Sequence, residues 1–225
     1  PGHSLTFAVL GTLILCFGWY GFNVGTAASV FAAENGSLSL AAFESTVGRV
    51  ALTTTLAMGA GAIGAAGVSL MKSEKVDTLY VANGMLAGLV GITSGTDIVT
   101  WVGALVIGLL AGGQLPIVFE FVERRLKIDD VCAVYPVHGS AGAMGAILIP
   151  FFHINGFSAT QLAAQVVSVT AIGAWTILAT VAVFGALKAI GQARVSPDHE
   201  REGLDIAEHG VNTYPEFGPE GGVVT

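Results

Sequence analysis

The chain has 225 residues, of which 53% are hydrophobic and 11% charged, and its mean hydropathy is +0.73. Soluble domains carry about 25% charged residues, so this composition excludes an ordinary soluble protein and predicts a multi-pass protein of the lipid bilayer. Most of the net charge of −7 comes from residues 196–225, which hold seven acidic residues and one basic residue. An acidic tail of this kind argues against a polybasic lipid anchor and against nucleic-acid binding.

Six apolar segments are each long enough to cross roughly 30 Å of hydrocarbon as a helix. The many glycines are typical of transmembrane helices that pack closely. We therefore expect an all-α transmembrane bundle over residues 1–195 and an acidic cytoplasmic tail over residues 196–225. The predicted helices lie near residues 7–31, 47–71, 78–96, 98–122, 131–152 and 162–191.

The basic residues predict the orientation of the bundle. They follow the second, fourth and sixth segments, whereas the opposite loops contain no lysine or arginine, and Arg49 is the single exception. Since cytoplasmic loops are enriched in lysine and arginine, both termini are expected in the cytoplasm. The residues that carry this argument are Lys72, Lys75, Arg124, Arg125, Lys127, Lys188, Arg194 and Arg201.

The first segment carries a stripe of four residues, Leu15, Trp19, Phe22 and Thr26, at spacings that place them on one helix face. Aromatic ring faces and a hydroxyl could hold a cation at the outer end of this stripe, at about 2 kcal/mol for each desolvated cation–π contact. The same spacing also fits plain helix packing or an interfacial aromatic belt, so the pattern alone leaves both interpretations open.

His138 is the only ionisable side chain near the middle of the fifth segment. A polar group inside a bilayer is costly unless it has a partner or faces a cavity, and a neutral imidazole both donates and accepts a proton. Regular α-helical spacing would put Val134 and Gly142 on its face. The alternative is a structural histidine bonded to a carbonyl of the next helix. Asp129 and Asp130 precede the segment and are predicted to cap it.

Five motifs occur in order along nearly the whole chain. They are Phe17-Gly-Trp-Tyr-Gly-Phe-Asn23, Leu52-Thr-Thr-Thr-Leu-Ala57, residues 83–93, Asp129-Asp130 with Val137-His138-Gly139, and Arg201-Glu-Gly-Leu-Asp205 with His209-Gly210. Together they resemble the ammonium transporter (Amt/Mep/Rh) family, in particular its Amt branch. The resemblance implies the C-terminal half, helices six to eleven, of an eleven-helix protomer made of two inverted halves. Three such protomers form a homotrimer with a pore in each. Because the chain matches only the C-terminal half, the N-terminal half of the same protein is an expected partner.

The resemblance also implies roles for the pore residues. Phe22 matches one of two phenyl rings at the outer gate, Trp19 lines the same lumen, and Thr26 takes the place of a serine that recruits ammonium. His138 matches one member of a twin-histidine pair whose partner lies in the other half. Leu15 and Val134 match apolar pore-lining positions. Where many relatives read Asp-Asp-Pro this chain has Val131, so a local change at the helix start is expected.

The implied activity is transport at the cell membrane without an enzymatic step or a cofactor. Ammonium would be captured outside and deprotonated, and ammonia would cross the apolar lumen while the proton travels separately through the histidines. The tail residues Arg201, Glu202, Gly203, Leu204 and Asp205 match a regulatory segment that would receive a PII-type signalling protein. The alternatives are an ammonium sensor that signals through this tail, an Rh-like electroneutral gas channel, and an unrelated glycine-rich transporter.

Overall fold

The computed structural model describes residues 4–27, 32–34, 37–39 and 43–211. The last residues of the first predicted segment, 28–31, and the end of the acidic tail, 212–225, lie outside the described residues. The chain divides into two compact units, residues 1–169 and residues 170–225.

The described chain is almost entirely helical, as predicted for an all-α protein. Each predicted apolar segment overlaps one helical stretch, and the only strands among the described residues are the three-residue pair β1 and β2, which the sequence did not predict. In chain order the elements are α1 (Leu5–Ala27), β1 (Ala32–Glu34), β2 (Ser37–Ser39), α2 (Phe43–Ser73), α3 (Thr78–Thr93), α4 (Trp101–Glu120), η1 (Phe121–Leu126), η2 (Tyr135–Ser140), α5 (Ala141–Leu148), η3 (Ile149–Phe151), α6 (Ala159–Ala189), α7 (Pro197–Glu202) and α8 (Leu204–His209).

By length and composition, four helical stretches of the described chain could each cross a membrane. They are Leu5–Thr26, Thr46–Ser73, Trp101–Leu126 and Ala159–Ala189. α3 is shorter, because the predicted segment 78–96 ends in a turn that begins at Ser94. The fifth predicted segment is divided between a π-helix, an α-helix and a 3₁₀ turn, namely η2, α5 and η3.

Side-chain caps fix where α3 and α4 begin. The Asp77 carboxylate accepts hydrogen bonds from the backbone N–H groups of Leu79 and Tyr80, at 2.7 and 3.2 Å. The Thr100 hydroxyl oxygen accepts one from the N–H of Gly103, at 3.1 Å. Such caps satisfy N–H groups that have no partner within the helix, so each helix starts directly after its capping residue.

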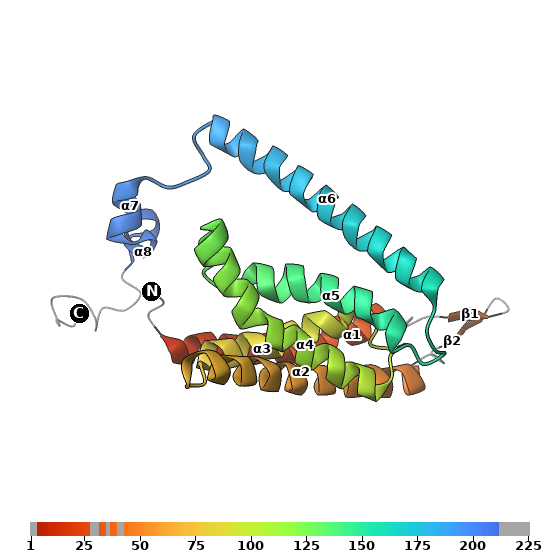
Figure 1. Ribbon diagram of the computed structural model, residues 1–225. Helices are drawn as coiled ribbons and strands as arrows, with labels where there is room; N and C mark the ends of the chain where they lie inside the picture. The colour runs from red at the N-terminus through yellow and green to blue at the C-terminus, as the bar shows by residue number, and fades with distance from the viewer. Residues whose placement is uncertain (1–3, 28–31, 35–36, 40–42, 212–225) are drawn as a thin grey trace. The chain divides into compact units, whose positions relative to one another are not determined.

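The centre of the first unit is a three-helix contact in which backbones touch. α2, α3 and α4 lie side by side (Figure 1). A Cβ atom added at Gly112 of α4 would meet the carbonyl group of Gly61 on α2, and one added at Gly88 of α3 would meet that of Ala57. Only glycine leaves room for this approach, which lets α-helices pack through dispersion contacts in lipid.

Apolar side chains fill the layer between this contact and α5. Leu89 of α3, Leu115 of α4 and Val137 of η2 are buried in one cluster, and Cys16 of α1 joins the same cluster. Cys16 is therefore a packing residue in this structure.

We expect Gly112→Ala to lower the free energy of unfolding by about 1–3 kcal/mol, because the new methyl group forces α2 and α4 apart. Thermal unfolding of the detergent-solubilised protein measures this change. Gly59→Ala on α2 is the matched control, since a Cβ there meets no atom within 4 Å. Equal melting temperatures for the two variants would contradict the close-contact explanation.

Candidate functional site

The structure brings together three of the residues that the sequence singled out. The Trp19 ring centroid lies 5.4 Å from that of Phe22 and 6.1 Å from that of His138. Trp19 and Phe22 belong to α1 and His138 to η2, so side chains more than 100 residues apart in sequence form one cluster. We call Trp19, Phe22 and His138 the aromatic–histidine cluster.

The position of Trp19 is fixed by hydrogen bonds to α3. Its indole Nε1–H donates to Thr93 Oγ1 at 2.9 Å, and the Thr93 hydroxyl donates to the Leu89 carbonyl at 2.7 Å. Thr93 closes the third sequence motif, but sequence reasoning assigned it no role. Its place at the end of an otherwise apolar helix was the available signal, because a hydroxyl there has few partners other than a neighbouring helix.

A second set of hydrogen bonds joins α1 to the threonine run of α2. Asn23 Nδ2 donates to Thr54 Oγ1 at 3.0 Å, and the hydroxyls of Tyr20 and Thr55 share a hydrogen bond of 2.6 Å. Thr53 and Thr55 also donate to carbonyls of their own helix, four residues earlier. Thr54 faces α1 instead. These contacts fix the orientation of α1 about its own axis, in which Trp19 lies next to both Phe22 and His138.

Three residues of the stripe, and the predicted pore-lining residue Val134, are exposed in the described chain. Phe22 is 55% exposed, Leu15 43% and Val134 55%. Thr26 is exposed as well, and its hydroxyl donates to the Phe22 carbonyl at 2.8 Å. The Thr26 oxygen therefore keeps lone pairs that could accept a hydrogen bond from a ligand.

His138 lies on a π-helix, a feature that the sequence did not predict. The π-helical turn Tyr135–Ser140 lies between Val134 and Gly142, the two positions that regular spacing predicts on the face of His138. The backbone N–H of Ala141 bonds to the Pro136 carbonyl, five residues back instead of four. π-helical turns are rare and frequently occur at functional sites. The His138 ring is exposed and makes no hydrogen bond within the described part of the chain.

The start of this helical segment depends on Asp130. Its two carboxylate oxygens accept hydrogen bonds from the N–H groups of Val134 and Tyr135, at 2.7 and 2.9 Å. Val131–Ala133 form a turn, in which Ala133 has a φ of +56°, so the helix begins later than the predicted residue 131. Asp129 is exposed, and its side chain makes no hydrogen bond among the described residues.

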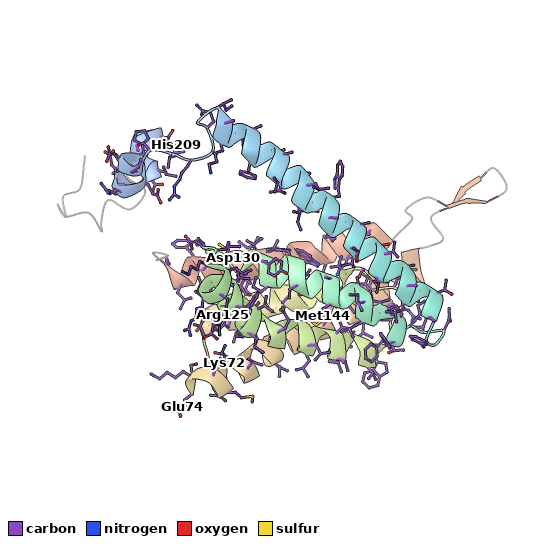
Figure 2. The ribbon with its side chains drawn as sticks, turned by 45° about the horizontal axis from the view of Figure 1, so that its top comes forward. Lys72, Glu74, Arg125, Asp130, Met144 and His209 are labelled. Atoms are coloured by element: carbon purple, nitrogen blue, oxygen red, sulfur yellow. The ribbon has the colours of Figure 1, made fainter. Side chains whose placement is uncertain are left out.

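Charged residues gather at the end of the bundle where Asp130 lies. Glu120 at the end of α4 forms ion pairs with Lys72 of α2 and with Arg124. Figure 2 shows Lys72, Arg125 and Asp130 at this end of the unit, with Met144 further along α5. Over the described residues, no group of three or more His, Cys, Asp and Glu side chains has the geometry to hold a metal ion.

The second unit contains the described part of the acidic tail. Gly203, with a φ of +99°, separates α7 from α8, and His199 Nδ1 lies 3.0 Å from Glu208 Oε1 across this bend. Of the tail motif, Arg201 and Glu202 end α7, whereas Leu204 and Asp205 begin α8.

An ion pair joins α7 to the segment before it. Arg194 donates to both carboxylate oxygens of Glu200, at 2.8 and 2.9 Å. These hydrogen bonds and the positive charge of Arg194 lower the pKa of Glu200. The contact is therefore fully present above the ordinary glutamate pKa of about 4.3 and is lost as the pH falls through the lowered value.

We expect Asp130→Ala to destabilise the protein by about 0.5–2 kcal/mol, because two N–H groups at the start of the helix lose their acceptor. Asp129→Ala is the matched control. It removes the neighbouring carboxylate without removing a described hydrogen bond, and its effect should stay within about 0.5 kcal/mol. Chemical or thermal unfolding of both variants measures the difference. Equal losses of stability in the two variants would show that the negative charge of the aspartates, and not the hydrogen bonds of Asp130, supports the helix start.

Sequence comparison identifies relatives along nearly the whole chain. A family model described as Ammonium Transporter Family matches residues 1–214. "Ammonium transporter Amt2" of Haloferax mediterranei is 66% identical over 223 residues, which cover 97% of this chain and 49% of that protein. "Ammonium transporter Amt1" of Methanocaldococcus jannaschii is 41% identical over 219 residues, with 96% of this chain and 52% of that protein covered.

Solved structures show the same fold. A protein described as "Sensor Amt Protein" superposes with a TM-score of 0.80 at 31% identity, over 92% of this chain and 49% of that chain. Saccharomyces cerevisiae Mep2 gives a TM-score of 0.73 at 28% identity, over 87% of this chain and 45% of that chain. The chain thus spans about half the length of the relatives it matches. Its helices, its motifs and these matches show that the chain belongs to the ammonium transporter family, whose members are multi-pass membrane proteins and not enzymes.

Proposed function

We propose that this chain forms one wall of a pore that carries ammonium across the cell membrane. The observation that supports the proposal most directly is the aromatic–histidine cluster, in which Trp19 lies beside both the exposed Phe22 ring and the exposed, ionisable His138 ring. The relatives at 66% and 41% identity are both named ammonium transporters.

The proposed path starts at Phe22 and Thr26. An ammonium ion at the outer mouth would meet the face of the Phe22 ring and the oxygen of the Thr26 hydroxyl. A cation–π contact and a hydrogen bond suit a small cation that carries N–H donors. Trp19 would form the wall between this position and His138, because its ring lies next to both side chains.

Beyond this point the cost of burying charge favours ammonia. Moving a bare cation through an apolar lumen costs many kcal/mol, whereas a neutral molecule avoids this penalty. We propose that ammonium loses a proton near Phe22, that ammonia passes the apolar walls at Leu15 and Val134, and that His138 carries the proton. Potassium has no proton to release and would be rejected.

The other wall of the pore would come from the N-terminal half of the same protein. That half would supply a second phenyl ring for the gate and a second histidine beside His138. The exposure of Phe22, Leu15 and Val134 supports this assignment, because it leaves one face of the site open for a facing half. Three such protomers would assemble as a homotrimer, each with its own pore.

We expect His138→Ala to abolish the ammonium-evoked current of the full-length protein, because no group on this wall would then relay the proton. Electrophysiology on a supported membrane with reconstituted protein measures the current. His153→Asn replaces a histidine outside the cluster and should conduct as the wild type does.

An unchanged, ammonium-selective current in His138→Ala would contradict the relay. Ammonia flux without current in the wild type would favour the electroneutral gas channel. Tight binding of ammonium without flux would favour a sensor, a function that the transporter names of the relatives do not support.

For the tail we propose a regulatory role on the cytoplasmic side. The end of α2 and the segments after α2 and α4 carry basic residues, and basic segments between helices face the cytoplasm in most membrane proteins. They are Lys72, Lys75, Arg124, Arg125 and Lys127. An even number of crossings then returns the C-terminus to the same side. Residues 201–205 at the α7–α8 bend would couple protomers and, with the loops, receive a PII-type protein.

Deleting residues 196–225 should change the transport rate and reduce capture of a purified PII-type trimer, because the proposed contact segment is removed. Uptake of labelled methylammonium and pull-down in detergent measure the two effects. Deleting only residues 212–225 is the matched control, since it keeps α7 and α8. The regulatory proposal fails if the longer deletion leaves both measurements at wild-type values.

A further inference from the structure

Gln114 on α4 contacts the turn that carries His138 at two points. Its Nε2 donates to the Pro136 carbonyl at 2.8 Å, and its Oε1 accepts a hydrogen bond from the Ser140 hydroxyl at 2.6 Å. Pro136 and Ser140 lie two residues before and two residues after His138. One side chain from a neighbouring helix therefore bridges both ends of the segment that presents the imidazole.

These two hydrogen bonds oppose conversion of the π-helical turn into a regular α-helical turn. A serine in a regular helix can donate to the carbonyl four residues earlier, which for Ser140 is that of Pro136. Here Ser140 donates to Gln114 instead, and the Pro136 carbonyl accepts from Gln114 and from the N–H of Ala141. The bridge thus occupies the Ser140 hydroxyl, and it also engages the Pro136 carbonyl, which in an α-helical turn would accept from the N–H of Ser140.

Gln114 is itself held in place. Its Nε2 also donates to the Ala111 carbonyl of its own helix at 3.0 Å, and the adjacent Leu115 is fully buried. Gly112, two positions earlier, lies in the glycine contact with α2. Gln114 is half-buried on an otherwise apolar stretch of α4, where alternative hydrogen-bond partners are few, so these hydrogen bonds are costly to lose.

We propose that Gln114 is a positioning residue for His138: it holds Tyr135–Ser140 in the π-helical register that points the imidazole toward Trp19 and the transport path. This inference rests on the proposed function, since it assumes that His138 lines the path of the proton.

The test is Gln114→Met in the full-length protein, a change that keeps a side chain of similar length and removes both hydrogen bonds of the bridge together with the one to Ala111. We expect the ammonium-evoked current to fall by about tenfold, because a displaced relay group transfers protons poorly. We also expect the pH profile of the remaining current to shift, a change that loss of folded protein alone would not produce. Gln165→Met on α6 makes the same replacement elsewhere and should match the wild type.

Ser140→Ala is a second test variant, because it removes one hydrogen bond of the bridge and keeps the glutamine. Its current should fall less than that of Gln114→Met, and the double variant should behave as Gln114→Met does. If Gln114→Met does not fold, Ser140→Ala decides the question. Wild-type current and pH profile in the variants would overturn the inference, whereas a wild type without ammonium transport would instead overturn the proposed function.

Discussion

The close approach of α2, α3 and α4 is the constraint on which the rest of the first unit depends. Where Gly61, Gly88 and Gly112 meet neighbouring backbone, the three helix axes have no freedom to separate or rotate without losing contact. Helices in lipid gain little from the hydrophobic effect between them, so dispersion contact at small residues has to supply the association. The positions of Thr93 on α3 and Gln114 on α4 follow from this packing.

Those two polar residues connect the packed helices to the candidate site through hydrogen bonds. Thr93 accepts the indole N–H of Trp19, and Gln114 binds on both sides of His138. Neither contacts the imidazole directly. Hydrogen bonds have direction as well as strength, so in a bundle of apolar surfaces they are what determines the rotation of α1 and the register of η2. The glycine contact sets the spacing of the helices, and the polar contacts set which side chains face the site.

Much of this arrangement could be predicted from the sequence, because the bilayer imposes simple rules on length and polarity. Apolar runs of sufficient length located the six helical stretches, and the spacing of Trp19 and Phe22 correctly placed them on one face. The π-helix around His138 could not be predicted in the same way. It depends on hydrogen bonds from Gln114, which is more than 20 residues away, and periodicity within one segment contains no information about such a partner.

The start of the fifth segment illustrates the same limit on a smaller scale. Two adjacent aspartates before a helix both suit a cap, and their sequence does not distinguish them. The choice falls on Asp130 because the chain turns through Val131–Ala133, with Ala133 in the left-handed region, before the helix begins. Val131 keeps a backbone N–H in that turn, which a proline at this position would lack.

The proposed path combines one ionisable group, His138, with apolar walls. The two features together would determine which solutes can pass. Exposed Leu15 and Val134 offer a cation no compensation for its lost hydration, so an ion that stays charged is excluded. His138 offers a proton acceptor but no fixed charge, so it does not by itself stabilise a passing cation as a carboxylate would. Under the proposed mechanism, such a wall would discriminate by whether the substrate can release a proton, and not by its size. The selectivity expected of the proposed path would therefore rest on the imidazole of His138 acting together with the apolar side chains of Leu15 and Val134.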